Sequence, residues 1–426
     1  MKSKNNIDSH RQLEKFSNGT HLLTIGIPKS NTLSILFYFK VGSKYETISI
    51  NGISHFIEHL LFKGNKKYPN TIDMARKLDE FGVYYNAFTN KETTAYHYKM
   101  VSTDPKILEF VCDITFQMFF HSLFRNTDIT KERHVVIEEY NKTLNEPDTL
   151  FEQIIDGLIF TGHSLELFIP GKPDSLKKIK KTDILEYYKK YYRLDNLIIC
   201  LVGGGVAEGR EIVRKKYNGR SSEIVNLKSI GSSVNILPFV SKFNELKQVS
   251  KVYRPLAQNI IYIVCPTFGS LDENKYVHRL ITTLLSGGMS SRLFVNIRDK
   301  HGLVYSISSN TTSYMEGGFL YIKFSTDLKH TNKCIELVED EIKKIIHKGF
   351  TQRELNINLR SIENLYKMNF EYIENIATFY GEQILCNNSV LSIDEYSNVL
   401  KNISLNRIND VFKDIFKNYK VIIYGG

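Results

Sequence analysis

The sequence predicts an α+β protein built from two similar halves. Segments typical of strands and of amphipathic helices alternate along the chain, and their order repeats. "HSLF" ends at Phe124 and "HKGF" at Phe350, 226 residues later, while "LIICLVGG" ends at Gly204 and "KVIIYGG" at Gly426, 222 residues later. A chain of 426 residues is also longer than one hydrophobic core usually serves. We therefore expect two homologous domains.

The expected elements of the first half begin with a β-rich segment that leads into an apolar helix. Val83–Val101 has the pattern of two strands joined by a turn. The elements are, in chain order, a strand at 32–42, helices at 52–64 and 70–82, the two strands within 83–101, helices at 104–120 and 128–146, and a strand at 195–205.

The second half repeats this order. Its expected elements are a strand at 258–269, a helix at 274–288, a strand at 317–326, a helix at 329–350 and a strand at 418–426. The Ser- and Gly-rich stretch that begins at Asn218 has the composition of a linker. The sequence thus predicts a first domain at 1–217, a linker at 218–240 and a second domain at 241–426.

The composition is that of an ordinary globular protein. Hydrophobic residues make up 42% and charged residues 24%, and the N-terminus has no apolar stretch typical of a secretory signal. The five cysteines form no C-x-x-C pair, which favours reduced thiols in a cytoplasmic protein. The formal net charge is +10, but the lysines are spread along the chain and not interleaved with aromatic residues. We therefore expect neither nucleic-acid nor membrane binding.

The segment "GISHFIEHLLFKG" carries the strongest chemical signal. His55, Glu58 and His59 fall within five residues of an otherwise apolar helix. At about 100° per residue, the three side chains share one face of that helix. Two imidazoles one turn apart are suited to holding a zinc ion, and the intervening glutamate is placed to take a proton from water. H-x-x-E-H is a known signature of zinc proteases.

A catalytic zinc ion needs a third protein ligand. The helix "KERHVVIEEYNKTLNE" offers Glu132, Glu138 and Glu139. Glu132 and Glu139 are seven residues apart and share a face, whereas Glu138 points about 100° away from Glu139. This spacing alone does not choose among the three glutamates.

The chain resembles the M16 metallopeptidases, and within them the M16B branch that includes the mitochondrial processing peptidase and its bacterial relatives. The resemblance covers nearly the whole chain and rests on "HFIEHLLFKG", "YNAFTNKETTAY", "ERHVVIEEY" and "GGMSSRLFVNIRDKHGLVYS", in that order. It implies two LuxS/M16-like domains, each a mostly antiparallel sheet covered by helices. The second half has no His/Glu cluster, so the two halves cannot have the same role.

The resemblance implies that one Zn²⁺ per chain is bound by His55, His59 and Glu139, with Glu58 as the general base. Glu132 would support the site. The gap between His59 and Glu139 is a few residues longer than usual in the family, which keeps Glu138 as an alternative ligand.

The resemblance also assigns residues to the substrate. Arg298 and Tyr305 would hold the scissile carbonyl and the developing oxyanion, as donors placed where charge grows. Asn86, Ala87 and Phe88 would lie on a strand whose edge pairs with an extended peptide.

The expected activity is therefore that of a zinc endopeptidase acting on extended or unfolded peptides inside a closed chamber made by two chains. A homodimer would be self-sufficient, and a heterodimer with a second M16-like chain is the alternative assembly. A non-catalytic M16-like scaffold is the alternative function.

Overall fold

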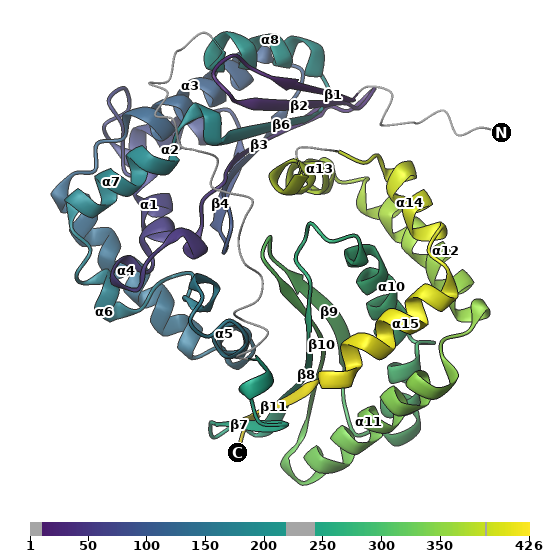
Figure 1. The fold of residues 1–426 in the computed structure, drawn as a ribbon. Coiled ribbons are helices and arrows are strands. Elements are labelled where there is room, and N and C mark those ends of the chain that lie inside the picture. Colours follow the sequence, from purple (N-terminus) through teal and green to yellow (C-terminus); the bar gives the residue numbers. More distant parts are fainter. Residues whose placement is uncertain (1–10, 219–242, 388–389) are drawn as a thin grey trace. The chain divides into compact units, whose positions relative to one another are not determined.

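The computed structural model describes residues 11–218, 243–387 and 390–426, and these residues form two compact units (Figure 1). The first unit contains residues 11–157, 162–218, 369–387 and 390. The second contains residues 158–161, 243–368 and 391–426. The predicted linker, 218–240, lies outside the described residues except for Asn218.

The first unit is organised around a six-stranded sheet with strand order β1-β2-β6-β3-β5-β4. β2 and β6 are parallel, and the other neighbours are antiparallel. The strands are β1 (Arg11–Lys15), β2 (His21–Gly26), β3 (Thr32–Phe39), β4 (Tyr84–Thr89), β5 (Thr94–Val101) and β6 (Leu197–Gly203).

One face of this sheet carries the larger core of the unit. Alternate residues of β3, among them Ile35, Phe37 and Phe39, point to this face and are fully buried, as the two-residue repeat of a strand requires. Helices of the first half supply the rest of the core. The helices are α1 (Ile53–Leu61), α2 (Thr71–Glu80), α3 (Pro105–His121), α4 (Asn126–Leu144), α5 (Pro147–Ile159), α6 (Pro173–Leu176), α7 (Lys181–Tyr191) and α8 (Val206–Tyr217), with short helical turns η2 (Ser43–Tyr45), η3 (Ile48–Ile50), η4 (Ser164–Glu166) and η5 (Leu194–Asn196).

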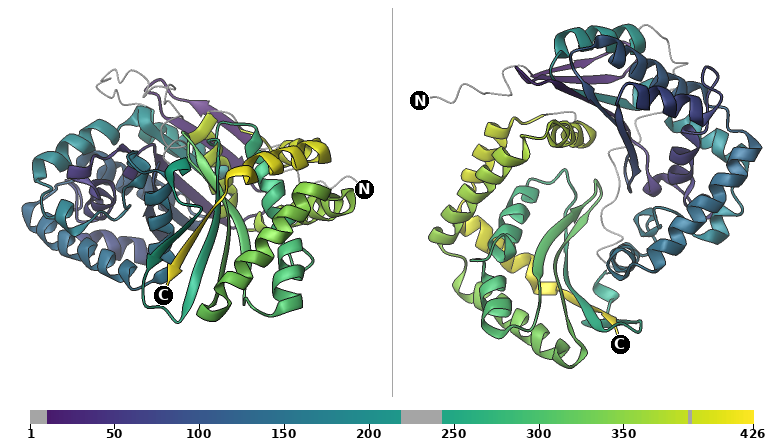
Figure 2. Two further views of the ribbon diagram at one scale, coloured as in Figure 1. Left: turned by 60° about the horizontal axis from the view of Figure 1, so that its bottom comes forward. Right: turned by 180° about the vertical axis from the view of Figure 1, so that it is seen from behind.

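The opposite face is covered by a helix from the far end of the chain. α13 (Ile373–Asn387) packs on β3 and β6, and Figures 1 and 2 show it beside this sheet. A Cβ on Gly381 would lie 2.4 Å from Cε2 of Tyr38 and 3.2 Å from Sγ of Cys200, so the helix approaches the sheet very closely. α13 lies inside the range expected to form the second domain, but its apolar stripe fits this face of the first sheet.

The second unit has a five-stranded sheet with strand order β7-β11-β8-β10-β9, in which only β7 and β11 are parallel. Helices cover the face that holds its core (Figure 2). The elements are β7 (Val249–Tyr253), β8 (Gln258–Thr267), α10 (Asn274–Ser286), the π-helical segment η6 (Phe294–Asp299), β9 (Ile307–Ser313), β10 (Gly318–Asp327), η7 (Leu328–His330), α11 (Thr331–Lys348), α12 (Gln352–Asn369), α14 (Ile393–Lys401), α15 (Leu405–Ile415), η8 (Phe416–Asn418) and β11 (Lys420–Gly425).

The two sheets have the same topology. Replacing β2 to β6 by β7 to β11, in chain order, converts the order β2-β6-β3-β5-β4 into β7-β11-β8-β10-β9. The parallel pair falls at the same place in both sheets. The prediction of two similar α+β halves, each with a mostly antiparallel sheet and helices, is therefore confirmed, and β1 has no counterpart among the described strands of the second unit.

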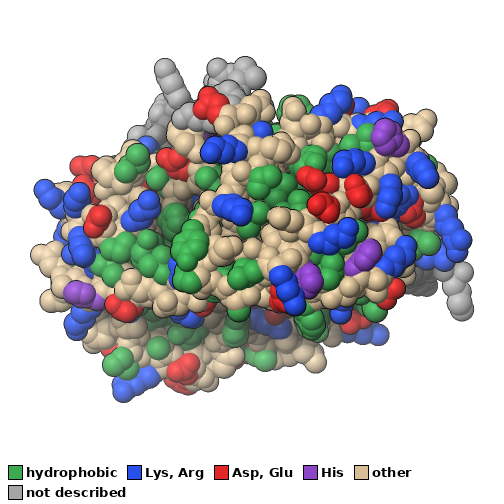
Figure 3. Space-filling view, turned by 90° about the horizontal axis from the view of Figure 1, so that it is seen from below, with side chains coloured by type: hydrophobic (Ala, Val, Ile, Leu, Met, Phe, Trp, Pro, Cys, Tyr) green, Lys and Arg blue, Asp and Glu red, His purple; other side chains and the backbone are tan. Residues whose placement is uncertain are grey.

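On the face drawn in Figure 3, lysines and arginines are interspersed with acidic side chains. The five cysteines are free, and all but Cys386 are buried. Within the described residues, no helix combines the length and apolarity needed to cross a bilayer.

Candidate metal centre

Helix α1 presents the H-x-x-E-H motif from a firmly packed position. Gly52, which precedes the helix, has φ of 96°, and a Cβ there would lie 2.7 Å from the carbonyl oxygen of Pro170, so glycine is required. Phe56 and Leu60 are buried in the core and fix the apolar side of the helix. His55, Glu58 and His59 share the side that packs towards α4 and β4.

Helix α4 brings the third group. Glu139 lies opposite the two histidines, and one ligand atom from each of the three residues lies within 4.8 Å of the others. This is the only such cluster of three or more potential ligands in the parts of the chain that the structure describes. Glu138 is exposed, and its Oε1 accepts a hydrogen bond from Asn141 Nδ2 at 3.4 Å. The geometry thus brings Glu139, and not Glu138, to the histidines.

The three atoms have the spacing of a metal site. His55 Nε2 and His59 Nε2 are 3.3 Å apart, and Glu139 Oε2 is 3.5 Å from the first and 3.4 Å from the second. Atoms about 2.0–2.1 Å from a tetrahedrally bound zinc ion lie about 3.3–3.4 Å from one another. The donor set, two imidazoles and a carboxylate, is also one that zinc accepts in catalytic sites. The residues therefore fit a zinc ion without rearrangement.

Glu132 contacts the Nδ1 side of His59, away from the proposed metal. Its Oε2 lies 3.4 Å from His59 Nδ1, and its Oε1 lies 2.8 Å from Lys63 Nζ. The side chain of Glu132 is buried. A carboxylate that accepts the Nδ1 proton leaves the Nε2 lone pair of His59 free for a metal and fixes the ring orientation. Lys63 in turn neutralises this buried carboxylate.

Glu58 lies next to the cluster but outside the triangle. Its Oε2 accepts a hydrogen bond of 2.6 Å from Thr89 Oγ1, at the end of β4. Burial raises the pKa of the Glu58 carboxyl, and the Thr89 hydrogen bond offsets part of this rise. A buried carboxylate with a raised pKa is a better proton acceptor than an exposed one, as a general base requires.

The pKa values of the two histidines are shifted in opposite directions. Burial, helped by the neighbouring His59, lowers the pKa of His55 to about 4, so His55 is neutral and ready to bind a metal at neutral pH. Burial also lowers the pKa of His59, but the carboxylates of Glu139, Glu58 and Glu132 outweigh it and raise that pKa overall. A metal ion binding here would compete with protonation of His59, which these carboxylates favour.

The proposed substrate residues lie on the strand next to α1. Asn86, Ala87 and Phe88 belong to β4, which is an edge strand and, among the described strands, pairs with β5 alone. Asn86 and Phe88 are exposed, and Ala87 is half-buried. No described strand pairs with the outer edge of β4 along the segment that leads to Thr89.

The predicted Arg298 and Tyr305 lie in the second unit. Arg298 is in η6, and its guanidinium carbon lies 5.4 Å from the centre of the Tyr305 ring. Tyr305 is 86% exposed. Stacking against the arginine keeps the two polar groups together.

Sequence reasoning missed Lys63 and Thr89. Lys63 had a usable signal, because it follows His59 by four residues and the helix expected at 52–64 would place both on the same side. Thr89 had none, since its partner Glu58 is 31 residues away and meets it only through the packing of α1 on β4.

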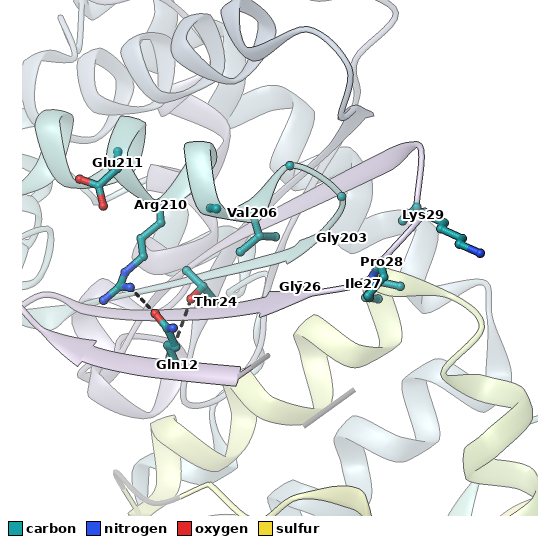
Figure 4. A pocket seen from close by; sticks show the side chains of 14 residues that line it. Gln12, Thr24, Gly26, Ile27, Pro28, Lys29, Gly203, Val206, Arg210 and Glu211 are labelled. Atoms are coloured by element: carbon teal, nitrogen blue, oxygen red, sulfur yellow. Dashed lines mark hydrogen bonds between the residues drawn. The ribbon is translucent and has the colours of Figure 1, made fainter. Parts of the chain in front are cut away.

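A separate pocket of about 610 Å³ lies where the β2–β3 turn meets the start of α8 (Figure 4). Arg210, one of its lining residues, donates hydrogen bonds to Gln12 and to the neighbouring Glu14. It contains no histidine and is distinct from the metal centre.

Two family profiles match the chain. The family described as Insulinase (Peptidase family M16) matches residues 22–168, and the one described as Peptidase M16 inactive domain matches residues 178–361. A Bacillus subtilis protein named uncharacterized zinc protease YmxG is 26% identical over 403 residues, 94% of each chain. A Rickettsia felis protein, also named uncharacterized zinc protease, is 26% identical over 413 residues, 95% of each chain.

Solved structures share the fold. The crystal structure of a protease from Helicobacter pylori superposes with a TM-score of 0.85 at 18% identity, covering 98% of this chain and 99% of that one. The crystal structure of a peptidase M16 inactive domain from Pseudomonas fluorescens gives a TM-score of 0.82 at 15% identity, with 97% of each chain covered. Both the likeness in fold and the match in sequence thus extend over almost the whole chain.

Proposed function

Because the chain belongs to the M16 peptidase family, we propose that it is a zinc endopeptidase that cleaves extended or unfolded peptides. The observation that carries this proposal is the triangle of His55, His59 and Glu139, whose donor atoms are 3.3–3.5 Å apart. The names of the relatives in Bacillus subtilis and Rickettsia felis, both called zinc proteases, support it.

The metal and the residues around it divide the chemistry. A zinc ion at this site supplies a Lewis acid that polarises the scissile carbonyl and makes water more acidic. Glu58 takes the proton from the attacking water and passes it to the leaving amine. Glu132 and Lys63 keep His59 in the orientation and tautomer that zinc binding needs. Thr89 restrains the Glu58 carboxylate.

The substrate lies along the edge of β4. An extended peptide can pair its backbone with this strand, which explains a preference for unfolded segments over a particular sequence. Asn86, Ala87 and Phe88 line that edge. Arg298 and Tyr305 donate to the carbonyl oxygen of the scissile bond as negative charge develops on it. Their pairing at 5.4 Å supports a shared role.

The working assembly is a homodimer that encloses the peptide. Since this one chain carries both the zinc motif and the Arg298/Tyr305 pair, two identical copies supply every element. A heterodimer with a second M16-like chain is the alternative assembly, and gel filtration of the purified chain alone distinguishes the two.

The test compares the native protein with Glu58→Gln. Purified native protein should contain about one zinc ion per chain and should cleave a quenched unstructured peptide, and a chelator should abolish cleavage. The glutamine variant should keep its zinc but lose at least about 100-fold in rate, because it cannot accept a proton. Zinc binding without any cleavage by the native chain would favour the non-catalytic scaffold, and normal cleavage by Glu58→Gln would refute its role as base.

A further inference from the structure

The residue that precedes helix α1 offers no side chain to cap the N-terminus of the helix. The residue before the helix is Gly52, which lacks a side chain, and the first-turn amide groups cannot bond within the helix. This helix nevertheless carries both histidines of the metal centre. A loosely held first turn would let His55 move relative to Glu139 on α4.

Glu46 takes the place of the missing cap. It lies between the turns η2 and η3, six residues upstream of Gly52. Its Oε2 accepts the backbone N–H of Gly52 at 2.6 Å, and its Oε1 accepts the backbone N–H of Ser54 at 2.8 Å. The same Oε2 also accepts Nδ2 of Asn51 at 2.9 Å. One carboxylate therefore satisfies two backbone donors at the start of the helix, and Ser54 directly precedes His55.

The surroundings make this contact rigid. Glu46 is 4% exposed, and Asn51 is buried. Asn51 Nδ2 also donates to the carbonyl oxygen of Phe168 at 2.8 Å, and Ser54 Oγ lies 2.8 Å from the Tyr187 hydroxyl. The first turn of α1 is thus tied through Glu46 and its neighbours to two other parts of the unit.

Ordinary capping would account for the helix without involving a buried carboxylate. Caps are usually exposed serine, threonine, asparagine or aspartate residues next to the helix, and burying a carboxylate is costly. A buried glutamate that is distant in sequence and uses both oxygens does more than start the helix, because it also fixes the position of the helix in the fold. Burial raises the pKa of Glu46 to about 7, while the N–H groups of Gly52 and Ser54 favour its ionised form, which also complements the helix dipole.

We propose that Glu46 is a positioning residue for zinc binding, which fixes His55 in register with His59 and Glu139 by anchoring the first turn of α1. This inference rests on the proposed zinc site. Glu46 touches neither the metal ligands nor the substrate, and it acts through the backbone of Gly52 and Ser54.

The test measures zinc affinity in the whole chain by competition with a chromophoric chelator. Glu46→Gln keeps the size of the side chain but turns an NH₂ group towards a backbone N–H. Its zinc affinity should fall about 10- to 100-fold, the usual effect of losing a residue that orients a ligand. The visible absorption bands of the cobalt(II)-loaded variant should also shift, because the His55 ring changes its position.

Asn18→Ala provides the matched control. Asn18 is a buried residue of the same unit, and its side chain bonds the backbone of Tyr217 at 2.6 Å and of Thr20 at 3.1 Å. It should lower thermal stability yet leave zinc affinity and the cobalt spectrum unchanged. If Glu46→Gln does not fold, Glu46→Asp replaces it, since the shorter carboxylate can hold only one of the two N–H groups and should still weaken zinc binding several-fold.

The outcomes separate the inference from the function. Native-like zinc affinity in the folded Glu46 variants would overturn the positioning role, as would an equal loss in Asn18→Ala. A native chain that takes up no zinc would instead refute the proposed function.

Discussion

Replacing Glu139 by glutamine tests the metal centre most directly. The change keeps the length of the side chain and removes the charge of the one carboxylate that faces both histidines, at 3.5 and 3.4 Å. Because the three donor atoms already have tetrahedral spacing, a zinc ion gains each bond without reorganising the protein. The loss of one ligand should therefore cost close to its full share of the binding free energy.

The expected size follows from known sites. Four-ligand structural sites bind zinc with about 10–16 kcal/mol, or about 2.5–4 kcal/mol per ligand. At about 1.4 kcal/mol per factor of ten, Glu139→Gln should weaken zinc binding about 100- to 1,000-fold. Competition with a chelator of known affinity measures this change, and peptide cleavage at limiting zinc should fall in parallel.

Glu138→Gln is the matched control, because it makes the same chemical change one residue away on the exposed side of α4. Its zinc affinity should stay within about 3-fold of native, a change of under 1 kcal/mol. If Glu139→Gln binds zinc as tightly as native, or if Glu138→Gln loses as much, Glu139 is not the third ligand.

Three further predictions concern other parts of the chain. Lys63→Met should weaken zinc binding about 10-fold in the same competition assay, because Glu132 loses its cationic partner and orients the histidine less firmly. Burial raises the pKa of Glu354, but the hydrogen-bonded Arg292 outweighs burial and brings this pKa down to about 2. The ion pair therefore stabilises the folded state at pH values above about 4.5, the pKa of the unfolded glutamate. The urea midpoint of native protein should therefore exceed that of Glu354→Gln at pH 7, and the difference should disappear as pH falls from about 4.5 to about 2. Gly381→Ala should lower the free energy of unfolding in urea by about 1–3 kcal/mol, because the added methyl group overpacks the contact between α13 and the sheet. Gly157→Ala is the control: a Cβ there meets nothing within 4 Å, so the free energy of unfolding should stay the same or rise by up to about 1 kcal/mol.

The sequence alone predicts the part of the site that lies on a single helix. His55, Glu58 and His59 lie within one helical turn and a half, so their common face follows from helix geometry alone. The choice between Glu138 and Glu139 is different, because it depends on how α4 is rotated against α1. Only the packed structure shows that Glu139 faces the histidines and that Glu138 faces solvent.

The two-fold repeat of the fold was also readable, since strand order and glycine positions recur in the sequence. The packing of α13 was not. Ile376, Tyr380 and Ile384 have helical spacing and predict a buried stripe, but nothing in that stripe says which sheet it covers. Glu46 was missed for a related reason, because a cap six to eight residues upstream has no local signature.

Helix α13 has a consequence for how the chain is made. The ribosome completes residues 11–218 long before it reaches Ile373. Until α13 is made, the face of the first sheet that carries Tyr38 and Cys200 stays uncovered. If the two halves were expressed separately, the N-terminal half would keep this apolar face of its sheet exposed and would be prone to aggregate. The first half of the sequence therefore depends on a helix that the second half encodes, so it cannot complete its fold when it is made alone.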